Sequence, residues 1–305
     1  MNTILIKNKE NFPNMQSHNK SPFAIFSQTE ELVKTEYELI NHTLQLREID
    51  ELILVLANKF LIVTSIMLEN ILNDRLGIQT EKKEIQVRVK QLAHYEYLNS
   101  YRFKDFTNGT QSANKIYTVG WRGVGFLKAK GVKPNLVGYI NNNLNNVQAK
   151  KILSVNQYLI KSEFRLDDFC VAEIVRNNNF KDGKSDTIFR PHAIINTDTD
   201  TIIVESVRKN ESYLDEISKK ITRICKTIKK NCESVKHPDN ITLMLIGEDF
   251  SHIEFVVKYL NSIHPFMLLN FKIAFTSDLQ IYKSNHEEFV YEYRPSMLQN
   301  LFCPI

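Results

Sequence analysis

Residues 80–120 read TEKKEIQVRVKQLAHYEYLNSYRFKDFTNGTQSANKIYTVG, and this stretch decides the fold of the first half of the chain. It begins with a predicted helix, because Ile85, Val89 and Leu92 recur at three- and four-residue steps and would lie on one side. The hydroxyl of Thr80 is expected to cap this helix. The other side is expected to carry cationic and amide side chains together with one valine: Lys83, Gln86, Val87, Lys90, Gln91 and His94.

Two strands and a further helix are predicted after it. Residues 97–106 alternate between apolar and polar side chains like a strand, and residues 107–114 (TNGTQSAN) form a polar turn. Residues 115–120 (KIYTVG) return as a second strand. Residues 121–131 then form a short helix that Gly131 closes.

Two shorter helices are predicted upstream of this stretch. Apolar residues recur with helical spacing over residues 49–61, and a second helix starts at once, with Thr64 as its N-cap and Gly77 at its end. The resulting order is helix, helix, helix, strand, strand, helix. This is the order of a winged-helix domain, which we place at residues 46–131.

Such a domain predicts contact with double-stranded DNA. Amide and cationic side chains on the third helix suit the major groove, where they can pair with base edges. Cations on the two strands, Arg102, Lys104 and Lys115, can reach the flanking phosphates. The alternative is an ordinary solvated helix face. We predict a DNA-binding set of Lys83, Gln86, Val87, Lys90, Gln91, His94, Arg102, Lys104 and Lys115.

Composition agrees with a globular protein of two domains. The 305 residues are 43% hydrophobic and 24% charged, and the net charge of +4 permits a polyanionic partner without requiring one. The 4 cysteines, without a secretory signal, are expected to be reduced thiols. No apolar run approaches the roughly 20 residues of a membrane span, so we expect a cytoplasmic protein and no membrane partner.

The rest of the chain divides as follows. Residues 1–45 are expected to be a flexible arm, with a helical end at residues 29–40 (TEELVKTEYELI). The Asn-rich residues 132–149 are expected to be a linker, and residues 291–305 a C-terminal tail. Residues 150–290 are expected to be an α/β domain with a central mixed sheet, which makes the whole chain α+β.

The elements expected in that second domain follow from its periodicity. They are a helix at 149–164, strands at 169–175, 187–195 and 201–207, a helix at 212–230, a strand at 241–247, a helix at 251–263 and a strand at 269–275.

Over residues 48–283 the sequence resembles the replication-relaxation family, which is encoded on plasmids and other mobile elements of bacteria. The first half carries the resemblance in the strand-then-glycine segment 116–131 (IYTVGWRGVGFLKAKG). In the second half it lies in the helix 150–160 (KKILSVNQYLI), the Arg-Pro-His-Ala segment 190–193 and the apolar strand that opens 202–212 (IIVESVRKNES).

The resemblance implies that the second half has a PD-(D/E)xK nuclease core. In that core an Asp and a Glu on adjacent strands bind a divalent metal, and a nearby Lys helps to activate water. Here His192 stands at the Asp position, and Glu205 is not followed by the expected lysine. The resemblance therefore implies a degenerate core without a complete catalytic set, and we expect no enzyme activity, metal or cofactor. The alternative is an active metal-dependent nuclease that uses Glu205 with Glu173 or Asp186.

Together these features predict a sequence-specific DNA-binding accessory or regulatory protein of a plasmid, phage or conjugative element, acting in replication, transfer or transcription. Replication or relaxase proteins are further candidate partners, and a scaffold that recruits them is another alternative. A homodimer is compatible with winged-helix regulators, although no coiled-coil heptads demand one. The glycines of GWRGVG (120–125) resemble a phosphate-binding loop only superficially, because no GK[ST] follows.

Overall fold

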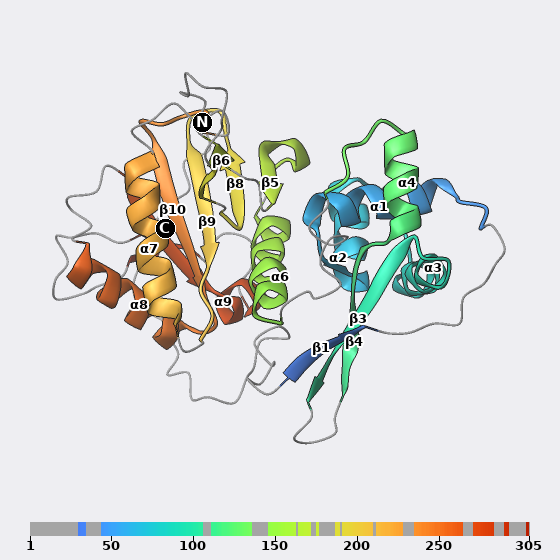
Figure 1. Cartoon of the computed structure of the whole chain (residues 1–305), viewed down its shortest axis with the longest axis horizontal. Helices are drawn as coiled ribbons and strands as arrows, with labels where there is room; N and C mark the ends of the chain where they lie inside the picture. Colours follow the sequence, from blue (N-terminus) through green and yellow to red (C-terminus); the bar gives the residue numbers. More distant parts are fainter. Residues whose placement is uncertain are drawn as a thin grey trace. The chain divides into compact units, whose positions relative to one another are not determined.

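The structure is a computed structural model, and its described residues form two compact units, within residues 26–156 (the first unit) and 157–305 (the second unit) (Figure 1). The division falls inside helix α6 (Asn146–Lys161), which begins within the expected linker 132–149. The described residues are 30–34, 44–105, 111–135, 146–162, 164–171, 175–176, 187–189, 191–209, 212–227, 235–264, 271–283, 290–292 and 303–304.

Three helices supply most of the first unit's core. They are α1 (Glu48–Phe60), α2 (Ser65–Asn70), which continues into a π-helical turn (Ile71–Arg75), and α3 (Lys82–His94). The helices expected from the periodicity are therefore present at these positions. Their apolar stripes are buried against one another, through side chains that include Ile53, Leu54, Ala57, Phe60, Leu68, Ile71, Leu72, Ile85, Val89 and Leu92.

Threonine has two different roles at the starts of these helices. The Thr64 hydroxyl accepts a hydrogen bond from Met67 N at 3.1 Å, and so caps α2 as expected. The cap expected from Thr80 is wrong, because Glu81 occupies the N-cap position of α3. The Thr80 hydroxyl instead donates to Asn73 Oδ1 at 3.0 Å, which ties the end of the preceding turn to the start of α3.

Replacing Thr64 by alanine is expected to lower the free energy of unfolding by about 1 kcal/mol, because the Met67 amide loses its acceptor. Urea denaturation of the full chain measures this change. Ser65→Ala removes a hydroxyl from the next position, where it makes no hydrogen bond among the described residues, and serves as the control. Equal losses in the two variants would show that the cap does not stabilise α2.

The turn between α1 and α2 is strained and is held by a residue from far along the chain. Leu61 adopts φ 64° and ψ −45°, and Ile62 N donates to Phe60 O at 2.7 Å, which makes a γ-turn of the rare, strained type. The buried Asn156 of α6 donates its Nδ2 to Phe60 O at 2.8 Å and to Ile62 O at 2.7 Å. Asn156 therefore satisfies the carbonyls on both sides of the strained residue.

A four-stranded antiparallel sheet completes the first unit, in the order β1-β3-β4-β2. Its main hairpin is β3 (Leu98–Asp105) with β4 (Gln111–Val119), so β4 begins within the turn expected at 107–114. α4 (Trp121–Ala129) follows, and Gly131 lies just after its end with a φ of 74°, a left-handed conformation that suits a residue closing a helix. The short β2 (Val63–Thr64) pairs with β4.

One segment of the expected N-terminal arm is a strand. β1 (Glu30–Lys34) pairs antiparallel with β3, with Leu32 opposite Phe103. The expected helix at 29–40 and the expected flexibility are therefore wrong for residues 30–34. The physical reason is the edge of β3, whose unpaired backbone groups gain hydrogen bonds from an added strand.

The second unit contains a seven-stranded mixed sheet in the order β13-β12-β11-β10-β9-β8-β5. The three central strands, β9, β10 and β11, are parallel, whereas the strands on both flanks run antiparallel to their neighbours. The expected α+β class with a mixed sheet is confirmed. The strands are β5 (Phe169–Val171), β8 (Ala193–Asn196), β9 (Thr201–Ser206), β10 (Ile241–Gly247), β11 (Lys272–Ser277), β12 (Tyr291–Glu292) and β13 (Cys303–Pro304).

Two helices connect the parallel strands and pack on the sheet. α7 (Tyr213–Thr227) joins β9 to β10, and α8 (Phe250–Ile263) joins β10 to β11. Their apolar residues share one buried cluster with those of the three strands, so both helices cover the same face (Figure 1). None of the helices in the described ranges is long and apolar enough to cross a membrane.

The remaining elements depart from the expected pattern. The expected strands 169–175 and 187–195 each split, because β6 (Val175–Arg176) and β7 (Thr187–Phe189) form a separate hairpin. A 3-10 turn (Leu166–Asp168) and α9 (Asp278–Lys283) were not expected. The expected C-terminal tail 291–305 contributes β12 and β13 to the large sheet, so its described residues are not a tail.

Candidate nucleic-acid interface

The exposed face of α3 carries the side chains that the sequence pattern placed there. Lys83, Gln86, Val87 and Lys90 are exposed, whereas Ile85, Val89 and Leu92 on the opposite side are fully buried. Two further residues of the predicted set, Gln91 and His94, are only half-buried. The helix therefore presents two cations, an amide and an isopropyl group together, on a face that the first unit leaves exposed.

A buried ion pair fixes α3 against α1. The Arg88 guanidinium donates from Nε to Asp50 Oδ1 at 2.7 Å and from Nη2 to Asp50 Oδ2, and both residues are buried. Asp50 Oδ2 also accepts from Arg47 N at 2.8 Å, which closes the first turn of α1. Arg88 further donates from Nη1 to Gln91 Oε1 at 2.5 Å. The same arginine thus anchors the helix and orients one of its predicted DNA contacts.

A shallow hollow of about 290 Å³ opens on this face, at the start of α3. Sequence reasoning missed four residues that line it, which are Arg47, Glu81, Glu84 and Arg88. The hollow therefore mixes both signs of charge around an apolar group. Its lining residues are Arg47, Glu81, Lys83, Glu84, Val87, Arg88 and Gln91.

Two cations of the β3–β4 hairpin lie side by side. Arg102 and Lys115 are directly opposite in the antiparallel register, so they share one face of the sheet, and both are half-buried. Their neighbour Tyr101 is buried on the core side. The side chain of the third predicted cation, Lys104, lies outside the described residues, as does the hairpin tip.

In the second unit, Glu205 is the one described residue of the alternative catalytic set, and it contacts a lysine and a histidine. The fully buried Glu205 places Oε2 at 2.6 Å from Lys220 Nζ and at 2.6 Å from His192 Nδ1. Burial alone would raise the pKa of Glu205, but the charges and hydrogen bonds of Lys220 and His192 lower it to about 2.

This cluster differs from the one that the sequence suggested. Lys220 comes from α7, where it lies on the edge of a helix whose Ile217, Ile221 and Ile224 are buried. Glu173 and Asp186 lie outside the described residues. Among the residues that are described, no group of three or more His, Cys, Asp or Glu side chains is arranged to hold a metal ion. The charge of Glu205 is instead compensated by protein cations.

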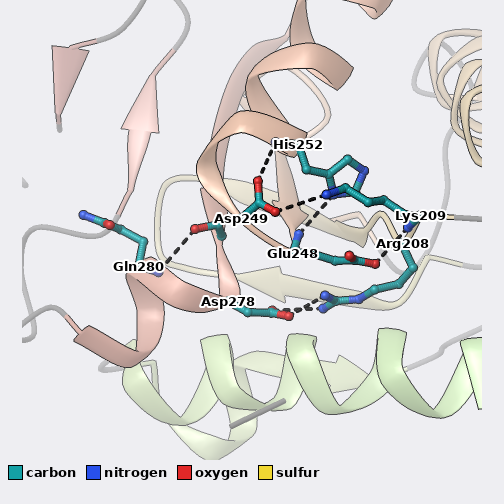
Figure 2. A network of polar contacts seen from close by, with 8 residues as sticks. Arg208, Lys209, Glu248, Asp249, His252, Asp278 and Gln280 are labelled. Carbon is teal, nitrogen blue, oxygen red and sulfur yellow. Dashed lines mark hydrogen bonds and ion pairs between the residues drawn. The ribbon is translucent and has the colours of Figure 1, made fainter. Parts of the chain in front are cut away.

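A second polar network ties together the carboxyl ends of the three parallel strands, and Figure 2 shows it from close by. Arg208 follows β9, and Asp278 follows β11. Arg208 donates from Nη2 to Asp278 Oδ1 at 2.9 Å. Lys209 Nζ lies 3.1 Å from Asp249 Oδ2, after β10. Carboxyl ends of parallel strands are where open sheets often bind ligands. Here Arg208 and Lys209 pair with the carboxylates of Asp278 and Asp249, so the network links the ends of the three strands to one another.

His252 belongs to the same network and is kept neutral. Its Nδ1 accepts from Glu248 N at 3.2 Å (Figure 2). Its ring packs edge-on against Tyr213. Burial, and then the positive charge of Lys209, lower the pKa of His252 to about 4, although Asp249 acts in the opposite direction. No sequence motif pointed to this residue, because its burial depends on the packing of α8 on the sheet.

The exposed face of α3 is the candidate site that the geometry favours, because it combines exposed lysines and an exposed amide with a fixed helix. The two clusters of the second unit pair their own charges. Comparison of the chain with protein-family models, with curated proteins and with solved structures finds no match.

Proposed function

We propose that this protein binds double-stranded DNA in a sequence-specific manner through α3, with the β3–β4 hairpin as a wing. The order of α1, α2, α3, β3, β4 and α4 supports a winged-helix assignment of the first unit. The observation that carries the proposal is the exposure of Lys83, Gln86 and Lys90 on one face of a helix. The resemblance to the replication-relaxation family supports a role on a plasmid, phage or conjugative element, in replication, transfer or transcription.

The side chains of α3 match the chemistry of a major groove. The Gln86 amide can both donate to and accept from an adenine, while lysine can meet guanine or a phosphate. Because Asp50 and Arg88 hold the helix through two hydrogen bonds, its exposed side chains project from a fixed backbone. A fixed helix supports specific recognition, since fewer conformations must be lost on binding.

The hairpin supports the same function through charge. Arg102 and Lys115 lie opposite each other on one face of the hairpin, so they bring two positive charges together. Cations on a wing can meet the DNA phosphates that flank the groove. The hairpin is therefore assigned to affinity and α3 to specificity, with duplex DNA as the partner.

The triple variant Lys83→Ala, Gln86→Ala, Lys90→Ala is expected to bind its target DNA much more weakly. Gln86 is expected to contribute about 1 to 3 kcal/mol if it pairs with a base, and each lysine that meets a phosphate contributes about 0.9 to the slope of log affinity against log salt. Fluorescence anisotropy measures both quantities, on a duplex selected by the wild-type protein from a random library.

The matched control removes two positive charges elsewhere. Lys236→Ala with Lys272→Ala changes exposed lysines of the second unit and is expected to leave affinity and salt slope nearly unchanged. If the triple variant stays folded and binds with wild-type affinity and slope, α3 does not read DNA. The first unit would then serve protein contacts, and the function would become that of a scaffold for replication or relaxase proteins.

A further inference from the structure

We infer that Val87 recognises the methyl group of a thymine in the major groove, an inference that rests on the proposed function. Val87 is 48% exposed in the middle of α3. Its neighbours on the exposed face are polar, with Lys83 one turn before it and Lys90 one turn after it. The other large apolar side chains exposed in the described part of the first unit, such as Val55 and Ile66, lie on different elements.

Thymine is the base that offers an apolar group in the major groove. In the major groove it presents its C5 methyl, whereas the other three bases present hydrogen-bond donors and acceptors there. An isopropyl group that meets this methyl removes apolar surface of both from water. The polar end of a lysine or glutamine at the same position would gain nothing from the methyl group. Val87 therefore distinguishes thymine from the other bases, whereas its polar neighbours do not use the methyl group.

The hollow around Val87 carries carboxylates as well as cations. Glu84 and Glu81 line it together with Lys83 and Arg47. A carboxylate accepts hydrogen bonds from base amino groups, which cytosine and adenine present in the major groove. An A·T pair offers an amino group and a methyl group side by side. The hollow around Val87 is therefore complementary to that pair.

Single replacement of each thymine by uracil tests the inference, because uracil keeps the pairing edge of thymine and lacks the methyl group. We expect one thymine position of the selected duplex at which the change weakens wild-type binding about fourfold, the equivalent of one buried methylene group. Val87→Ala is expected to weaken binding to the thymine duplex by a similar factor. At that position it should bind the uracil and thymine duplexes equally.

Two controls keep the outcomes distinct. Val55→Ala removes an exposed valine from α1 and should discriminate thymine from uracil as the wild type does. Because Val87 is exposed, its variant is expected to melt at the wild-type temperature. Discrimination that persists in Val87→Ala, or wild-type binding that no uracil weakens, overturns the inference while DNA binding stands. A wild-type protein that selects no duplex at all overturns the proposed function, and the inference with it.

Discussion

Replacing Arg88 by leucine is expected to destabilise the first unit by about 3 to 5 kcal/mol. The substitution leaves the Asp50 carboxylate in the core without the guanidinium that compensates it, and Asp50 is fully buried. An uncompensated buried charge costs far more than the ion pair itself contributes. Urea or thermal unfolding of the full chain, followed by circular dichroism, measures the loss.

Two companion variants separate charge from packing. Asp50→Leu combined with Arg88→Leu removes both charges, and is expected to recover most of the lost stability because no orphaned charge remains. The surface pair of Lys130 and Glu51, 3.0 Å apart and exposed on both sides, is the control. Lys130→Leu should change stability by about 1 kcal/mol or less. A similar small loss in Arg88→Leu would contradict the role given to the buried pair.

Acid is expected to destabilise the second unit by about 3 kcal/mol through His252 alone. The folded pKa of His252 is lowered to about 4 from an ordinary value of 6.5, so the unfolded chain binds the proton more readily between these values. The stability from the neutral ring is complete above pH 6.5 and is lost as pH falls through 4. Glu205, whose pKa falls from 4.5 to about 2, adds a loss in the range below 4.5.

Urea unfolding at intervals between pH 7 and pH 4 measures this dependence. His252→Gln is expected to flatten the curve between pH 6.5 and 4.5, where Glu205 does not yet titrate. Phe255→Leu, on the exposed side of the same helix, should keep the wild-type curve. A His252→Gln curve as steep as that of the wild type would assign the acid sensitivity to other groups.

The elements that the sequence predicts well are those set by neighbours in the chain. The helix stripes through Ile53 and Ile85 repeat every three to four residues, and the cap at Thr64 needs a partner only three residues away. The apolar run of β10 marks a strand buried on both faces, as it is in the centre of the large sheet. Local spacing suffices for each of these.

Interactions between distant segments could not be predicted in the same way. The pairing of β1 with β3 joins Leu32 to a residue about 70 positions later, and nothing in residues 30–34 specifies that edge. Lys220 reaches Glu205 only because α7 packs on the sheet. The sequence predicts that Thr80 caps α3, yet its backbone N and its hydroxyl both donate to Asn73 Oδ1. The exposed residues of α3 were predictable, because burial of its other side defines them.

The contact between Asn156 and the γ-turn at Leu61 limits where the chain can be cut without losing that turn. The limit applies to recombination between genes and to cleavage by a protease. The sequence predicts that the winged-helix domain ends at residue 131, but the donor for the Phe60 and Ile62 carbonyls comes 25 residues later. A fragment that stops at residue 131 would have to keep Leu61 in its left-handed conformation without that donor. The segment that must stay together therefore extends into α6. A gene exchange that preserves the turn must include Asn156.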